Sequence, residues 1–407
     1  MRFAVVSDIH ADELESRDTY VASEPPPSVA KQHPLADLID YVTDKQLKAD
    51  WLICPGDLAN KANSTGKAYG WKRLHELATA LDSKGIFATP GNHDVVTHTK
   101  VDDPAKELKL LNPSFPSGRP TDDETFWRDG FSLWDEDPLI RILNLNSCHS
   151  FPTHPGPAAD PAALAEYFSA LDRGAFTPEV QKGLKPILKG LTPKPVNILL
   201  CHHHPVEHER LDLFKDTYGP MERGGNLVQM LEDNASAGRW LIIHGHKHVP
   251  NSTTAGPSSN SPLILCSASL GGKLWHPIVT VTKNQFHVVE FDTTVVPGLA
   301  RTRGVIRSYM WGYGSGWQSA QPMSGLPATC GFGVIHDFRD LAQQVRDQLV
   351  SRAMEFESWS QLCLILPALR YQGPKDLELL EDELEAIGFR AERDRQGRIL
   401  KIARSLI

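Results

Sequence analysis

The feature that most constrains this chain is a set of five short polar segments, each of which directly follows an apolar run. Apolar runs of this length, bounded by polar residues, predict buried strands. The carboxyl ends of strands line the ligand crevice of an open α/β sheet, so we expect the five segments to meet there. They read Asp8-Ile9-His10, Gly56-Asp57, Gly91-Asn92-His93-Asp94, His202-His203-His204-Pro205 and Gly245-His246-Lys247-His248.

Apolar runs alternate with helical patterns along the first 250 residues or so. Strands are predicted over 3–6, 51–54, 86–88, 142–145, 196–201 and 240–243, and helices over 35–47, 68–81, 161–171 and 225–234. This alternation predicts a layered α/β domain with a central sheet covered by helices. Runs without intervening helices predict antiparallel strands that complete a second sheet, over 263–267, 277–282 and 286–291.

Three further parts of the chain depart from this pattern. The segments 11–33 and 98–137 are long, polar and proline-containing, and they are expected to be functional loops. Residues 296–334 begin irregular and glycine-rich, which indicates a linker or a packed arm. Residues 335–407 predict a small α+β unit with helices over 338–354, 359–366 and 374–387 and a hairpin over 389–403.

That order of elements would suit a winged helix. Its third helix, however, carries the acidic stretch 376–383, which would repel phosphates. We therefore expect the C-terminal unit to serve protein contact or oligomer formation rather than DNA binding.

The composition limits the classes of partner. A formal net charge of −8 offers no basic field for nucleic acid or anionic lipid. The six cysteines form no CxxC pair and lie mostly in apolar runs, which predicts reduced thiols in a cytoplasmic protein. No apolar stretch is long enough to predict a membrane span.

Carboxylate oxygen, imidazole nitrogen and amide oxygen are the donors that hard or borderline divalent metals prefer. In an extended segment, residues two apart point the same way. Asp8 and His10 are therefore expected to bind one ion together, and His246 and His248 are expected to lie on either side of a metal pair. Glycines that precede Asp57, Asn92 and His246 allow tight turns or close backbone approach.

The ordered set resembles the calcineurin-like metallophosphoesterases, whose motifs run DxH, GD, GNH[DE], a histidine at a strand end, and GHxH. The resemblance covers roughly residues 2–291. The runs 199–205 and 245–248 are most similar to those of the class III cyclic-nucleotide phosphodiesterases. This resemblance implies a four-layer α-β-β-α sandwich of two mixed sheets, with a catalytic domain over 1–295.

The resemblance also implies roles for single residues. Two divalent ions, manganese, iron or zinc, would share Asp57. The first ion would take Asp8, His10, Asp57 and His248, and the second Asp57, Asn92, His203 and His246. A hydroxide that bridges the ions would attack phosphorus in line, and His93, which is not a ligand, would protonate the leaving oxygen.

The sequence thus predicts a phosphodiesterase acting on a cyclic or other small nucleotide. Two alternatives stay open: a nuclease acting on DNA or RNA ends, and a non-catalytic scaffold with the same fold. Single histidines near the motifs are more often structural, and packing is the commoner use of tryptophan and tyrosine clusters. These expectations concern His98, His149, His208 and His244, and Trp311, Tyr313 and Trp317.

Overall fold

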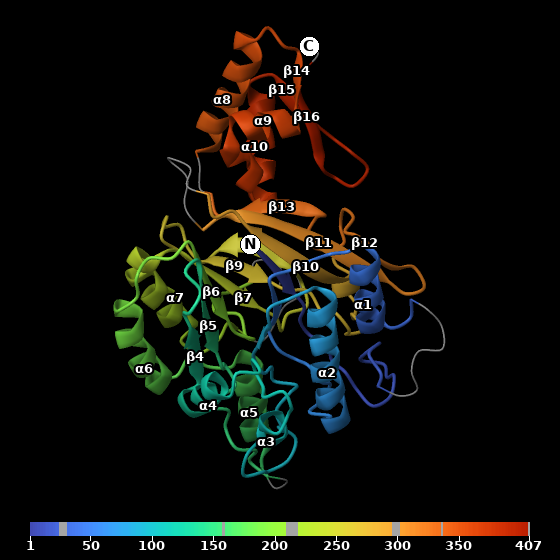
Figure 1. Ribbon diagram of the computed structural model, residues 1–407, viewed down its shortest axis with the longest axis vertical. Coiled ribbons are helices and arrows are strands. Elements are labelled where there is room, and N and C mark those ends of the chain that lie inside the picture. The colour runs from blue at the N-terminus through green and yellow to red at the C-terminus, as the bar shows by residue number, and fades with distance from the viewer. Residues whose placement is uncertain (24–30, 157–158, 209–218, 295–301, 335–336, 406–407) are drawn as a thin grey trace.

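Two large sheets packed face to face form the body of the protein, with helices on their outer sides and a smaller unit at one end (Figure 1). The structure is a computed structural model and describes residues 1–23, 31–156, 159–208, 219–294, 302–334 and 337–405. No helix in these ranges is long and apolar enough to cross a membrane.

The first sheet has seven strands in the order β12-β11-β10-β1-β2-β3, with β13 paired to β11. These are β1 (Arg2–Val5), β2 (Trp51–Cys54), β3 (Ile86–Ala88), β10 (Asn284–Phe291), β11 (Gly304–Gly312), β12 (Gly316–Ser319) and β13 (Thr329–Phe332). The second sheet has the order β4-β5-β6-β7-β9-β8. These are β4 (Phe131–Trp134), β5 (Ile140–Leu145), β6 (Val196–Leu200), β7 (Trp240–His244), β8 (Asn251–Thr254) and β9 (Leu263–Cys266).

Alternating side chains divide the core into three apolar layers. In β1, Phe3 and Val5 pack between the sheets, whereas Ala4 and Val6 face the helices. The helices α1 (Pro34–Asp44) and α2 (Ser64–Ala80) cover the first sheet, and α6 (Pro178–Lys189) and α7 (Gly224–Asp233) cover the second. The predicted four-layer α-β-β-α sandwich of two mixed sheets is therefore confirmed.

Most predicted strands and helices are present within a few residues of their predicted bounds, but the end of the second sheet differs. Residues 277–282 contain a short 3₁₀ helix, Ile278–Thr280, and not a strand. The strand β9 pairs in parallel with β7, and β10 joins the first sheet beside β1. The predicted antiparallel run is therefore wrong.

The segment 98–137 is more regular than predicted. It contains α3 (Lys106–Lys109), α4 (Pro120–Asp129) and β4. The signals for α4 are in the sequence: Pro120 occupies the first helical turn, and Gly130 ends the helix in the left-handed conformation with φ 77°. The helix α6, which the sequence analysis missed, begins at Pro178 in the same way.

The prediction of a linker or packed arm over 296–334 is wrong for the residues that the structure describes. The strand β11 pairs with β10 along the whole of its length, and β12 returns along β11. The glycines form the tight turn between them, where Gly314 and Gly316 both have φ 75°. The first sheet thus continues well past residue 295, and residues 295–301 lie outside the described part.

Two of the three aromatic residues near this turn pack against α1, as predicted. The indole N–H of Trp311 donates to Asp37 at 2.9 Å, and that of Trp317 donates to the Pro34 carbonyl at 2.8 Å. Both tryptophans are buried, whereas Tyr313 is exposed. Buried rings of this kind are not available to stack on a nucleobase.

The C-terminal unit contains the three predicted helices and the predicted hairpin around its own apolar core. Its elements are α8 (Phe338–Ser351), β14 (Phe356–Ser358), α9 (Trp359–Ile365), α10 (Pro374–Ala386), β15 (Phe389–Arg393) and β16 (Ile399–Arg404). The unit contacts β13, where the Gly331 N–H donates to the Gln372 carbonyl at 2.9 Å. The strand β13 pairs with β11, β11 pairs with β10, and the end of β10 lies beside Met1. The C-terminal unit is therefore at the amino end of β1.

Candidate metal centre

The structure brings the five polar segments together at the carboxyl ends of β1, β2, β3, β6 and β7. The backbone N–H of His246 lies 3.1 Å from an Asp8 carboxylate oxygen, and His202 Nε2 lies 3.4 Å from Asp57 Oδ2. Segments from both sheets therefore meet in one buried cluster. The cluster lies at the opposite end of β1 from the C-terminal unit.

A first group of donors surrounds Asp8. The Nε2 atoms of His10 and His248 face each other at 3.1 Å, and His248 Nε2 lies 3.2 Å from Asp8 Oδ1. Asp57 Oδ2 is 3.8 Å from His10 Nε2. The donor atoms of Asp8, His10 and His248 all lie within 4.8 Å of one another.

A second group surrounds Asn92. Its Oδ1 atom lies 3.1 Å from His202 Nε2 and 3.2 Å from His246 Nδ1. Because Asp57 Oδ2 lies near both His202 and His10, the carboxylate of Asp57 stands between the two groups.

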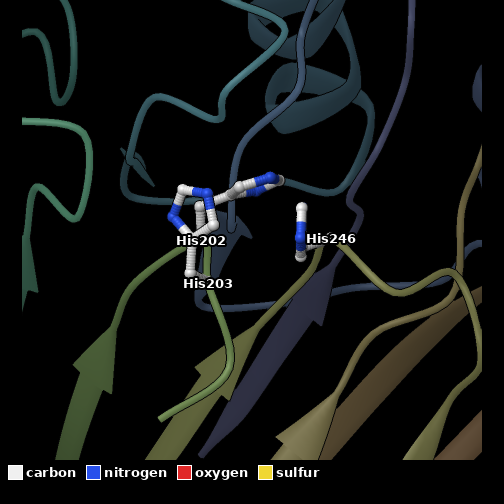
Figure 2. Close-up of side chains that lie close together, drawn as sticks. All are labelled: His202, His203 and His246. Atoms are coloured by element: carbon white, nitrogen blue, oxygen red, sulfur yellow. The ribbon is translucent and has the colours of Figure 1, made fainter. Parts of the chain in front are cut away.

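Among the three successive histidines, His202 faces Asp57 and Asn92, whereas the resemblance pointed to His203. The ring nitrogens of His203 are occupied elsewhere: Nδ1 lies 2.7 Å from Ser147 Oγ, and Nε2 lies 3.1 Å from the Leu171 carbonyl. Figure 2 shows the rings of His202, His203 and His246 close together. The donor atoms of His202, His203 and His246 all lie within 4.8 Å of one another, but of the three rings it is His202 that has a nitrogen at 3.4 Å from Asp57 Oδ2.

Five of the seven predicted ligands share an unusual backbone conformation. Left-handed φ values occur at Asp8 (51°), His10 (49°), Asp57 (54°), His246 (75°) and His248 (60°). Non-glycine residues in this region cost on the order of 1–3 kcal/mol each and cluster at functional sites. Asp8 and His10 do lie in one donor group, and His248 and His246 stand in the first and the second group respectively, but the reason given from an extended backbone is wrong.

Two glycines make room for the buried carboxylates. A Cβ atom at Gly91 would stand 2.0 Å from Asp57 Oδ1, and one at Gly245 would stand 2.6 Å from Asp8 Oδ2. Neither position has space for a larger residue. The close approach predicted from these glycines is therefore present, and it sets the positions of both aspartates.

The charges of the cluster suit a cation. Burial raises the pKa of Asp57, but His202, His93 and His10 outweigh burial and hold this pKa well below its usual value. Burial lowers the pKa of His202, yet Asp57 and Asp8 raise it to about 9, so this ring would have to release a proton in order to bind a metal ion. Burial lowers the pKa of His10 to about 3, so this ring is neutral, as a metal ligand must be.

Beside these two donor groups, which together form the metal-ligand cluster, lies an open cleft of about 580 Å³. His93 and Asn92 are among the residues that line it. The backbone N–H of His93 donates to Asp57 Oδ1 at 2.9 Å, and its ring packs edge-on against His10 with centroids 4.9 Å apart. The side chain of His93 thus borders both the donor groups and the open space where a substrate would enter.

The sequence analysis gave no role to three residues that support the site. Asp94 accepts hydrogen bonds from the N–H groups of Gly91 and Ala59, both at 2.9 Å, and so fixes the loop that carries Asn92. Ser147 holds His203. Asp172 Oδ1 lies 3.5 Å from His246 Nε2. No local motif marks Asp172, which projects from the end of α5 (Pro161–Arg173).

Of the four single histidines, His208 and His244 are buried and bond to backbone carbonyls, Val249 and Gly245 respectively. His98 lines the open cleft. His149 lines a second, smaller cavity of about 170 Å³ with Trp127 and Phe151.

Comparison with known proteins identifies the family. The profile of the family described as calcineurin-like phosphoesterase matches residues 1–266. Purple acid phosphatase from yellow lupin (Lupinus luteus) seeds is similar in structure, with a TM-score of 0.50, 11% identity, and coverage of 78% of this chain and 52% of that chain.

A dimetal phosphatase from Danio rerio gives a TM-score of 0.44 at 11% identity and covers 76% of this chain and 95% of its own. A calcineurin-like phosphoesterase from Bacillus subtilis gives 0.32 at 12% identity, with 86% and 98% covered. No curated protein matches the chain in sequence.

Proposed function

Because the chain belongs to the calcineurin-like phosphoesterase family, a family of metal-dependent phosphoester hydrolases, we propose that it is a binuclear phosphodiesterase of a cyclic or other small nucleotide. The observation that carries this proposal is the position of Asp57 between two groups of metal donors. Six free cysteines, five of them buried, support a reducing compartment, and we place the protein in the cytoplasm.

We assign six side chains and one shared carboxylate to the ions. The first ion takes Asp8, His10 and His248, the second takes Asn92, His202 and His246, and Asp57 serves both. His202 replaces the predicted His203, because both ring nitrogens of His203 bond to other groups. Oxygen and neutral imidazole donors in this mixture fit manganese, iron or zinc.

When bound, such a pair activates water at neutral pH and neutralises charge on the phosphoryl oxygens. The chain's own residues do the rest. The ring of His93 borders the cleft and protonates the leaving oxygen. Asp172 Oδ1 faces His246 Nε2 at 3.5 Å, and its negative charge favours the tautomer with the proton on Nε2, which leaves Nδ1 free to bind the metal.

The charges around the cleft support a diester substrate. Lys61 pairs with Asp18, and Lys247 lies 3.4 Å from Asp172. Each of these two cations thus already has a carboxylate partner. A phosphodiester carries one negative charge, whereas a monoester carries nearly two. The diester therefore needs less positive charge from the protein.

A substrate comparison tests the diester assignment. With Mn2+ supplied, we expect a higher kcat/KM for bis(p-nitrophenyl) phosphate and adenosine 3′,5′-cyclic phosphate than for p-nitrophenyl phosphate and adenosine 5′-phosphate. A preference for the monoesters would contradict the diester assignment. Higher activity on single-stranded DNA, with a steep salt dependence, would instead favour the nuclease.

The neighbouring histidines give a matched pair of variants. We expect His202→Ala to bind one metal ion fewer per chain, because it removes a donor 3.1 Å from Asn92 Oδ1. His203→Ala should keep both ions and lower the free energy of unfolding by roughly 1–3 kcal/mol, since it leaves Ser147 and the Leu171 carbonyl without their partner. Metal analysis of both purified variants checks this. The opposite result would restore His203 as the ligand.

A further inference from the structure

The open cleft beside His93 has two main walls. One wall is the loop 92–98, which follows β3, the other is α5, and Lys61 also lines the cleft. The Tyr167 hydroxyl donates to the Thr97 carbonyl at 2.8 Å and ties the two walls together. This hydrogen bond fixes the two walls relative to each other, and the cleft between them adjoins the metal-ligand cluster.

An aromatic side chain on α5 stands open in this cleft. Phe168 lines it and is 49% exposed, while the neighbouring Leu171 is buried at 5%. About half of Phe168 stays in contact with water, so a ligand that covered it would gain the free energy of burying this apolar area. Ligand sites combine such apolar side chains with a few polar groups that fix orientation. Here the polar groups are His93, Asn92 and His98.

The position of the cleft indicates which part of a substrate would occupy it. A phosphoryl group held by the two donor groups would place its leaving oxygen near His93, and the organic group attached to that oxygen would then extend into the cleft that His93 lines. The cleft-lining cation Lys61 is paired with Asp18, and the cleft also carries the carboxylate of Asp172. An additional phosphate on the leaving group would find no unpaired lysine among the described residues that line this cleft.

We propose that this cleft is the leaving-group subsite, and that it selects an uncharged alcohol with a planar aromatic ring, such as a nucleoside, which packs on Phe168. This inference rests on the proposed function. In the reaction, the oxygen of water bonds to phosphorus, the ester P–O bond breaks, and the leaving oxygen takes a proton from the ring of His93. The aromatic ring contacts Phe168 before and after the reaction, so the free alcohol also binds.

Binding of adenosine, which lacks a phosphate, tests the subsite without any catalysis. In titrations of the full chain followed by ligand-detected NMR, we expect saturable binding of adenosine, with methyl riboside binding far more weakly. Phe168→Ala should weaken adenosine binding about tenfold, and Phe168→Tyr should retain it. Phe356→Ala removes a phenyl ring that is similarly exposed, at 54%, in the C-terminal unit, and it should change nothing.

Adenosine binding that is undetectable, or that Phe168→Ala leaves unchanged, would overturn the subsite. This outcome is separate from a failure of the proposed function, which would appear as no hydrolysis of any diester by a protein that still binds adenosine. Thermal unfolding of Phe168→Ala confirms that the variant is folded, and the half-exposed position of the ring makes a large loss of stability unexpected.

Discussion

Replacing Asp57 with Asn is expected to lower metal binding from two ions per chain to at most one and to remove nearly all hydrolysis. Asn keeps the shape of the side chain and can still accept the hydrogen bond from the His93 N–H. It loses the negative charge that faces both His202 and His10. The rate should fall by more than the roughly 100- to 10,000-fold expected for loss of the general acid, because both metal sites lose a ligand.

The control variant changes an aspartate at the other end of the same strand, β2. Asp50 immediately precedes β2 and accepts a hydrogen bond from the Arg2 N–H at 2.7 Å, whereas Asp57 follows the other end of β2. Asp50→Asn should keep both ions and near-normal activity. If Asp57→Asn retained two ions and most of its activity, Asp57 would not be a shared ligand.

Replacing His93 with Ala is expected to lower kcat roughly 100- to 10,000-fold while both metal ions stay bound. The structure allows this separation, because the interaction of His93 with Asp57 runs through the backbone N–H, which Ala preserves. His149→Ala, a change at a histidine that lines the separate, smaller cavity, serves as the control and should affect kcat far less. Measurements of kcat and of metal content on the same samples check both variants.

A different role for His93 would have a clear signature. A ring nitrogen of His93 also lies within 4.8 Å of the donor atoms of His10 and Asp57, so these three side chains could hold one ion together. If His93→Ala lost one ion together with its activity, the ring would be a ligand and not the general acid. Normal kcat would remove it from the mechanism altogether.

The sequence predicts the layers of this fold well, because short apolar runs and amphipathic helices bury complementary faces. Where it fails, the missing information is the position of a partner strand. The strand β11 contains Arg307, Tyr309 and a glycine at each end, and it is stable as a strand because it pairs with β10 from Gly304 to Trp311. The run at 277–282 has apolar residues but forms no strand. Local pattern alone could not decide either case.

At the site, residue types and motif order point to the residues that gather, while finer geometry depends on the backbone. The left-handed conformations at Asp8, Asp57 and His246 are not apparent in the sequence. The choice between His202 and His203 depends on Ser147 and the Leu171 carbonyl, which come from other parts of the chain. A spacing rule within the run of histidines cannot include those partners.

The most direct test is anomalous X-ray diffraction from crystals of the protein grown with Mn2+, recorded near the manganese edge. We predict two anomalous peaks per chain, roughly 3.5–4 Å apart. The Asp57 carboxylate should lie between them, with His10 and His248 at one ion and His202, Asn92 and His246 at the other. A single peak, or no peak within bonding distance of Asp57, would contradict the binuclear centre.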